Sequence, residues 1–557
     1  MTPIPRLPSD AANAWSVPLF LATLCVSVLI RLVPDLWTET LTSYLLLVLV
    51  LGLAAVAAVR PRPAVLVAIA CIPISLNLGI PHSITSAPSD YLMVGAMLGA
   101  LPLLLRRLRD SGFMRLVVVV CLAPAVAALA STFSALGQFG FGSLKLSIAE
   151  TLGLGVGGAY AILIVLLFRT AQDLRAVAGA ACIGLAVAML SAAFSGYNTV
   201  FCPIPEGIFA GFHTHYRIYG LSGDPNIFSI QLAVLALLSS ALLLGFGAGR
   251  GFQSGLVALL ALVPLAVLLT GSRTGLVLLL PVAVAWMLTG WGRWAVLALG
   301  VITATGFAAN HLVWSELPCP GQGRGSEVVS FSERNDPLSY FGRYMTADEA
   351  AAKAQETVQQ QREMQEETLR RFRAMTVDDD IIAAVSNVAD ADIAGLPLDS
   401  LGMPGMVAHQ FILLTNDLPL DQARVRLWQA ASLLWAIKPV MGNGPGRMTA
   451  FTADANRSHN WYLTTAAETG LVGLVAFLLP ISAALGAGVY AFVIGTVDRR
   501  IVLVVVTAAV VAAAAPMAQD VGRQGVLWAA WGLALALVPV ARTARAPDPA
   551  AAATPTA

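Results

Sequence analysis

The sequence has few charged residues and almost no net charge. Only 12% of its 557 residues are charged and the formal net charge is +1, whereas 57% are hydrophobic and the mean hydropathy is +0.76. Soluble domains average about 25% charged residues, so this composition excludes a soluble globular protein and indicates a polytopic membrane protein. Because no overall field favours nucleic acid, we expect no nucleic-acid partner.

Several familiar signatures are missing as well. The first apolar run, 15–32, lacks a small-residue cleavage site, so we expect a retained span and not a removed signal peptide. Gly442, Gly444 and Gly446 are not a nucleotide fingerprint, because no strand precedes them and no phosphate-binding Lys-Ser/Thr pair follows. His213 and His215 have no Cys, Asp or Glu at ligand spacing, so we expect no metal site and no cofactor.

Cysteine is scarce, and its positions leave one pairing open. Four of the six cysteines fall in apolar runs and are expected to be inert: Cys25, Cys71, Cys121 and Cys182. Cys202 and Cys319 fall in segments expected outside the cytoplasm, where an oxidising periplasm permits a disulfide. Two unrelated thiols are the alternative.

Long apolar runs are abundant. We count fourteen stretches near the length that spans a bilayer. They are roughly 15–32, 41–59, 64–80, 91–105, 114–132, 147–168, 176–195, 227–247, 254–270, 274–290, 293–312, 471–495, 501–518 and 524–541. Several are short or contain proline, so twelve spans with kinked or re-entrant helices are the alternative count. The predicted fold is an all-α polytopic transmembrane helical bundle of about 14 spans with a large helical outer loop.

The basic residues orient these spans. With the N-terminus inside, the inner segments hold fifteen: Arg6, Arg60, Arg62, Arg106, Arg107, Arg109, Arg115, Arg169, Arg175, Arg250, Arg293, Arg499, Arg500, Arg542 and Arg545. The short outer loops and outer span ends hold five: Arg31, Lys145, Arg217, Arg273 and Arg523. Fifteen against five is a positive-inside bias, so both termini are predicted to be cytoplasmic and the long loop, roughly 313–458, to lie outside.

The predicted spans and loops divide the chain into five parts. They are an N-terminal transmembrane bundle of about seven spans at 1–195, an outer arginine loop with spans eight to eleven at 196–312, a large helical outer loop at 313–458, a C-terminal transmembrane segment at 459–545, and a disordered tail at 546–557. Within the large loop, 347–377 has helical composition, and 420–438 is amphipathic, as in helices that lie on a membrane surface.

Two arginines on the predicted outer side are candidate binding residues. Arg273 lies between two apolar runs with almost no loop around it, and a guanidinium near hydrocarbon usually has an anionic partner. Its fork of donors matches phosphate oxygens, although snorkelling to lipid headgroups is the alternative. Arg217 alone would be read as a solvated loop charge, but on the same face as Arg273 it could complete a diphosphate clamp.

The stretch from His459 to Gly473 is the most informative motif, because a histidine and an asparagine stand where a polar segment becomes an apolar run. A positioned imidazole can act as general base for a weakly acidic hydroxyl, typically contributing about 10²–10⁴-fold. The alternative is a surface histidine at a helix start, with Asn460 as the cap. Glu468 is expected to be a helix or interface residue with a lesser role in binding acceptor, and Asn460 and His215 are further candidates for substrate binding.

These features together resemble the O-antigen ligase and polysaccharide polymerase superfamily of bacterial envelopes. The ligase signature is His, then Asn, Ser or Gln, nine residues, Gly, two residues and Gly; here it reads His459, Asn460, Gly470 and Gly473. The two outer arginines, in RIYGLSGDPN and GSRTG, the GNGPG turn, and three spans after a large outer loop also look alike. The resemblance covers roughly 210–490.

The resemblance implies a metal-independent, inverting glycosyltransferase of the bacterial inner membrane whose active face is periplasmic. Its donor would be a glycan on undecaprenyl diphosphate, with Arg217 and Arg273 on the diphosphate and His459 acting on the acceptor hydroxyl. The acceptor would be another glycan or lipid A-core, and a chain-length regulator is a further candidate partner. The extra spans and the 347–377 helix depart from the ligases, which favours a polymerase.

Two other classes remain as alternatives. A solute transporter would place ionisable groups at the bilayer midplane and show internal repeats, and the sequence shows neither. A flippase for lipid-linked glycans would need basic residues along a path across the membrane, whereas the candidates here cluster on the predicted outer side.

Overall fold

The structure is a computed structural model that describes most of the apolar part of the chain. The described residues are 51–74, 87–139, 144–201, 213–214, 217–218, 220–245 except 223, 250–289 except 271, 427–448 except 429, 430, 433 and 437, and 457–545 except 520. Five of the predicted features lie outside them: the spans at 15–32 and 293–312, the 347–377 helix, His215, and the Cys202–Cys319 pair.

The described chain is helical apart from one two-stranded hairpin. Its elements are α3 (Pro61–Ala70), α4 (Pro88–Asp110), α5 (Gly112–Phe139), α6 (Leu144–Leu167), α7 (Ala171–Phe201), β1 (His213–Thr214), β2 (Arg217–Ile218), α8 (Pro225–Gly245), α9 (Arg250–Leu269), α10 (Arg273–Leu288), α17 (Trp461–Ile494), α18 (Arg499–Ala514), the short 3₁₀ helix η9 (Ala515–Met517) and α19 (Gly525–Arg545).

Nine helices among the described residues are long and apolar enough to cross a membrane. Each overlaps one of the predicted spans, and the shorter apolar helices α3 and α10 overlap two more. The predicted all-α transmembrane bundle is therefore confirmed, whereas the total number of spans and the division into five parts stay predictions. The largest difference is at α17, which begins ten residues before the predicted span at 471–495.

The outer helices carry large apolar side chains on exposed faces. Leu98 of α4 is 63% exposed, Leu190 of α7 is 71% exposed and Leu280 of α10 is 66% exposed. Surfaces of this kind are unfavourable in water and are what lipid tails contact. The exposure pattern agrees with the apolar composition in making this a membrane protein.

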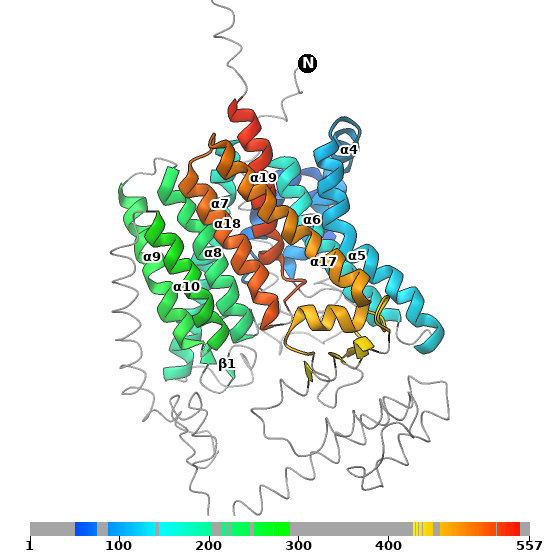
Figure 1. Ribbon diagram of the computed structural model, residues 1–557. Coiled ribbons are helices and arrows are strands. Elements are labelled where there is room, and N and C mark those ends of the chain that lie inside the picture. The colour runs from blue at the N-terminus through cyan, green and yellow to red at the C-terminus, as the bar shows by residue number, and fades with distance from the viewer. Residues whose placement is uncertain are drawn as a thin grey trace, which may run out of the picture.

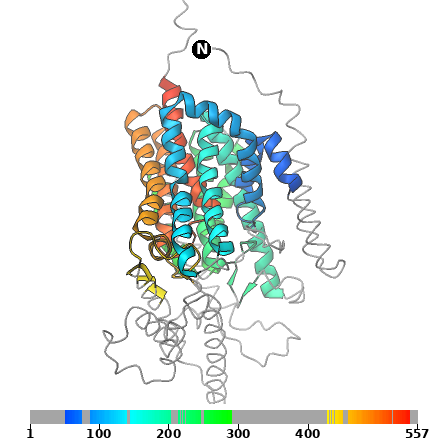
Figure 2. The same ribbon diagram turned by 90° about the vertical axis from the view of Figure 1, so that its right-hand side faces the viewer.

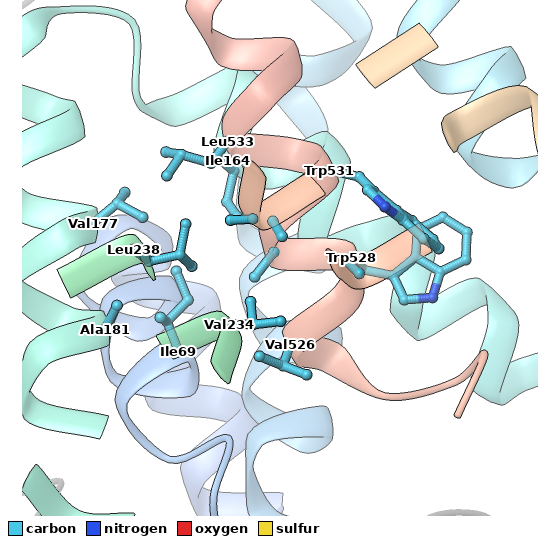
Figure 3. Packing of buried hydrophobic residues seen from close by; sticks show 14 of the residues in the cluster. Ile69, Ile164, Val177, Ala181, Val234, Leu238, Val526, Trp528, Trp531 and Leu533 are labelled. Carbon is cyan, nitrogen blue, oxygen red and sulfur yellow. The ribbon is translucent and has the colours of Figure 1, made fainter. Parts of the chain in front are cut away.

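The core is centred on α8 and α19, which are buried along most of their length. Figure 3 shows Leu533 of α19 beside Ile164 of α6, the two α19 tryptophans Trp528 and Trp531 next to each other, and Val234 and Leu238 of α8 near Ile69 of α3. A second aromatic group surrounds Phe477 of α17, whose ring lies 5.9 Å from that of Trp531 in an edge arrangement. This packing fixes α17 against α19, and α17 also packs against α5.

The long helices run roughly parallel, so their ends gather at two opposite faces of the bundle (Figure 1). The β1–β2 hairpin and the segment before α17 lie at one face, and the last turns of α19 lie at the other; the side view agrees (Figure 2). We call the first face the site end. It is where α8, α10, α17 and α19 begin and where α18 ends.

Polar caps begin the helices at both faces. The Ser272 hydroxyl accepts from the Gly275 N–H at the start of α10, and the Asn460 side chain accepts from two N–H groups at the start of α17. Asp498 caps α18 at the opposite face. Caps satisfy backbone donors that a helix leaves unpaired, which matters more where little water is present.

Candidate functional site

Arg217 lies in β2, in a turn that the bundle holds at the site end. Residue 217 pairs with Thr214 of β1, and the next residue, Ile218, is only 2% exposed. β2 packs against α7 and α9, and Asp224 then caps α8 by accepting from the N–H groups of residues 226 and 227. A buried isoleucine and a helix cap thus fix the backbone that carries this arginine.

Arg273 is the first residue of α10 and is exposed at the site end. The turn before it is held from two sides: Ser272 accepts from the Gly275 N–H at 3.1 Å, and the Ser229 hydroxyl of α8 donates to the Ser272 hydroxyl at 3.0 Å. The N-terminus of a helix carries a partial positive charge. The guanidinium therefore lies at a place that favours an anion.

His459 stands directly before α17 in a left-handed backbone conformation, with φ of 53°. Its ring Nδ1 lies 3.0 Å from Oε1 of Gln519, in the segment that follows α18 and η9. Because an amide oxygen only accepts, Nδ1 is the donor and the lone pair of the neutral ring lies on Nε2. This is the arrangement that a general base needs: one ring nitrogen oriented by a partner, the other carrying a lone pair.

The residues on either side of His459 are tied down. Ser458 is fully buried; its hydroxyl donates to the Asn460 carbonyl at 2.6 Å, and its own carbonyl accepts from the Trp428 indole at 2.9 Å. The Asn460 side chain accepts from the N–H groups of Tyr462 and Leu463. The cap given above as the alternative role of Asn460 is present, and the predicted role of Asn460 in binding substrate stays a prediction.

The motif glycine Gly470 breaks α17. Its backbone, at φ 68° and ψ −167°, is not helical, and a Cβ there would lie 2.2 Å from the Val440 carbonyl oxygen. The turn 439–448, which we call the glycine turn, fits into this break. The Leu471 N–H donates to the Pro439 carbonyl at 2.8 Å, and the Gly444 N–H donates to the Glu468 carbonyl at 2.7 Å. The backbone of the glycine turn therefore approaches Gly470 closely.

Glu468 lies in the last turn before this break, and it holds the glycine turn. Its side chain is buried, and Oε1 accepts from the Met448 N–H at 3.1 Å. Arg447 is buried beside it; burial lowers the pKa of Arg447 to about 10, and the charge of Glu468 opposes that shift. A guanidinium with this pKa remains protonated at neutral pH. Glu468 thus has an anchoring role in the structure, and acceptor binding by it stays a prediction.

Glu150 of α6 joins two segments that meet at His459. Its buried carboxylate forms ion pairs with Arg457 and with Arg523, the second at 3.1 Å between Nε and Oε2. Arg457 precedes His459 by two residues and also lies over the Trp461 ring, 5.4 Å from its centroid. Burial lowers the pKa of Arg523, and Glu150 opposes this shift. The sequence-based prediction did not include Glu150, Arg457 or Gln519 among the site residues.

A small, mainly apolar cavity lies beside this ion-pair group. Residues of α5, α6, the glycine turn and α17 line it, among them Glu150, Trp461, Thr465 and Glu468. The cavity volume is about 20 Å³, which is enough for one water molecule and too small for a sugar. Trp461 Nε1 and Thr465 Oγ1 are buried and have no hydrogen-bond partner among the described residues, so two polar groups are available to a water there.

The structure therefore places the predicted residues in two groups at one face. His459, Asn460 and Glu468 belong to the first half of α17 and its approach, whereas Arg217 and Arg273 belong to β2 and α10. The cavity contains Glu468 among its lining residues but not Arg217, Arg273 or His459. One signal could have identified Glu150 beforehand: it is an acidic residue inside a predicted span, where an ionisable group is costly and needs a partner.

The fold and these groups define a polytopic membrane protein with arginines and an oriented imidazole at one face of its bundle. Residues 256–478 match the family model described as O-antigen ligase, from α9 into the first half of α17. The match includes Arg273, His459 and both motif glycines, and it confirms the predicted resemblance to the O-antigen ligase and polysaccharide polymerase superfamily. The match supports membrane glycosyltransferase activity of ligase or polymerase type, and together with the apolar helices it supports a role in polysaccharide biosynthesis. A comparison with curated proteins gave no match.

Proposed function

We propose that the protein transfers a glycan from undecaprenyl diphosphate to an acceptor hydroxyl at the periplasmic face of the inner membrane. The observation that carries the proposal is the orientation of His459 by Gln519, within a chain that matches the O-antigen ligases. The matched family uses a lipid-linked glycan donor and a glycan acceptor. The exposed apolar faces of the outer helices suit a polyprenyl chain that stays in the bilayer.

In the proposed reaction, the acceptor oxygen attacks the anomeric carbon while the bond from that carbon to the phosphate oxygen breaks. The hydroxyl proton passes to Nε2 of His459, and undecaprenyl diphosphate leaves with the bonding electron pair. Negative charge grows on the leaving oxygen, where Arg217 and Arg273 stabilise it. Attack from the face opposite the leaving group inverts the anomeric centre. The two guanidiniums supply the positive charge, so the reaction needs no metal ion.

We further propose that the acceptor is a second lipid-linked repeat unit, which makes the protein a polymerase. The predicted 347–377 helix and the extra predicted spans depart from the pattern of the ligases, which supports the polymerase proposal. The second candidate is a ligase that uses lipid A-core as acceptor, and it is favoured by the description of the matched family model. Purified protein given one donor and each acceptor in turn separates the two by which acceptor gains the glycan.

The central test uses the purified full-length protein and an undecaprenyl diphosphate-linked oligosaccharide, with a chelator present. We expect release of undecaprenyl diphosphate and a longer glycan of inverted configuration. His459→Ala should lower the transfer rate by about 10²–10⁴-fold, because the acceptor hydroxyl loses its base. Arg109→Ala, an exposed arginine at the opposite face, is the matched control and should leave the rate unchanged.

Two outcomes would overturn the proposal. Full activity of His459→Ala would remove the base assignment. Movement of intact donor across vesicles containing the protein, without cleavage of the sugar–phosphate bond, would instead indicate a flippase.

A further inference from the structure

The position of His459 depends on two loops that come from distant parts of the chain. The histidine lies on the segment 457–460 before α17, and Gln519, which orients its ring, lies on the segment between η9 and α19. A hydrogen bond of 3.0 Å between two loops keeps one geometry only if both loops are held in register. Tyr462 contributes by donating from its hydroxyl to the Ala513 carbonyl at 2.6 Å, which joins α17 to α18.

Glu150 is the group that touches both loops. One carboxylate oxygen pairs with Arg457, two residues before the histidine, and the other lies 3.1 Å from Nε of Arg523, four residues after the glutamine. The carboxylate is only 5% exposed, and Arg457 is only 13% exposed. Partly desolvated ion pairs are screened far less than those at a surface, so this group is stiff. It is also carried by α6, which packs along α5 and α19 and does not belong to either loop.

We propose that Glu150 is a positioning residue for His459: by holding Arg457 and Arg523 together, it keeps the imidazole in register with Gln519. This inference rests on the proposed role of His459. Without the carboxylate, the two guanidiniums would face each other with no anion at ion-pair distance from both, since Glu468 interacts with them only from farther away. Their repulsion would separate the two loops and release the ring from Gln519, while the fold of the bundle stays intact.

The same ion pairs could instead serve stability alone, and a second buried carboxylate provides the comparison. Asp173 at the start of α7 is also buried, pairs with Arg62, and accepts from the N–H groups of residues 169 and 170. It lies in the first turn of a helix that begins at the opposite face. Asp173→Asn therefore breaks a comparable ion pair away from His459, which makes it the matched control for Glu150→Gln.

The test measures the state of His459 directly and then its activity. Diethyl pyrocarbonate acylates neutral imidazole nitrogens, and mass spectrometry of the purified full-length protein gives the rate at each of the six histidines. Glu150→Gln should raise the rate at His459 several-fold relative to the other histidines, and Asp173→Asn should leave it unchanged. Glycosyl transfer should fall by about 10- to 100-fold in Glu150→Gln through kcat, with little change in KM for the donor.

A double-mutant cycle then separates positioning from general destabilisation. In a His459→Ala background, Glu150→Gln should change the residual transfer less than about twofold, because the residue that it positions is already gone. An equal loss in both backgrounds, or an unchanged acylation rate at His459, would overturn the inference. Should Glu150→Gln not fold, Arg523→Gln removes a half-exposed partner of the same carboxylate and should give the same pattern. Full activity of His459→Ala would overturn the proposed base alone, since the acylation rate still tests Glu150.

Discussion

At the scale of single residues, the contact between His459 and Gln519 is the one whose chemistry is easiest to change. An amide oxygen 3.0 Å from Nδ1 orients the ring but carries no charge. A carboxylate in the same place would keep the orientation and stabilise the protonated imidazolium by charge. Replacing the amide of residue 519 by a carboxylate therefore keeps the orientation of the His459 ring and changes how strongly the ring holds a proton.

Gln519→Glu should move the acidic limb of the pH–activity profile to higher pH. The base acts only when the ring is neutral, and a neighbouring carboxylate favours the charged ring, so a higher pH is needed to reach the same active fraction. The rate at the high-pH plateau should stay within about tenfold of the parent protein, because the hydrogen bond persists. Transfer measured from pH 5 to 9 gives both quantities; an acidic limb that moves to lower pH would contradict the assigned role.

Residue-level prediction from the sequence succeeded where a residue's role is local. A helix cap was the alternative role given for Asn460, and the structure shows its side chain accepting from two N–H groups at the start of α17. Glu150 was not predicted, because its two arginine partners are 307 and 373 positions away in the sequence. A contact of that kind depends on how helices pack, and helix packing is not written in any local pattern of residues.

At the scale of elements, α17 is two helical segments joined at Gly470 and stabilised by the glycine turn. Breaking a helix frees backbone groups that are costly in a dry environment. Here the freed N–H groups of Leu471 and Val472 donate to the carbonyls of Pro439 and Val440, and the freed Glu468 carbonyl accepts from Gly444. The break thus lets a loop hydrogen-bond to the inside of a transmembrane helix about three turns beyond His459.

Gly470→Ala should destabilise the protein, because its φ of 68° and ψ of −167° form a conformation that is essentially restricted to glycine. Strain alone costs about 1–3 kcal/mol, and the new Cβ would also collide with the Val440 carbonyl. We expect a thermal midpoint in detergent lower by several degrees and a loss of transfer activity. Gly486→Ala in the same helix is the control: a Cβ there meets nothing within 4 Å, so that variant should be as stable as the parent or slightly more. Equal midpoints for the two variants would contradict this account.

The positions of the spans were predictable, whereas the break in α17 was not. Bilayer thickness requires about twenty apolar residues per helix, so apolar runs identify spans directly. The predicted span at 471–495 began too late, because the first turns of α17 contain Thr464, Thr465 and Glu468, which are buried against the glycine turn and neighbouring helices rather than exposed to lipid. An apolar composition identifies the helix residues that contact lipid. It misses polar helix residues that are covered by other parts of the protein.

At the scale of the whole molecule, the two faces of the bundle differ in how their arginines are used. At the face opposite the site end, arginines lie over aromatic rings, as Arg542 does at 5.8 Å from the Phe113 centroid and Arg499 does at 5.4 Å from that of Phe492. Such pairs are typical of side chains anchored at a membrane interface. At the site end, Arg457 likewise lies over the Trp461 ring, but it also shares one buried carboxylate with Arg523, whereas the buried Asp173 at the opposite face pairs with Arg62.

The excess of basic residues in the predicted inner segments predicts that the site end faces the periplasm. Arg109→Cys at the end of α4 and Val440→Cys in the glycine turn place single exposed thiols at the two faces, in a variant whose six native cysteines are replaced. A membrane-impermeant maleimide should label Val440→Cys in intact spheroplasts and Arg109→Cys only after the membrane is permeabilised. The reverse pattern would put His459 on the cytoplasmic side, away from a periplasmic donor, and would contradict the proposed reaction even in a protein that retains its fold.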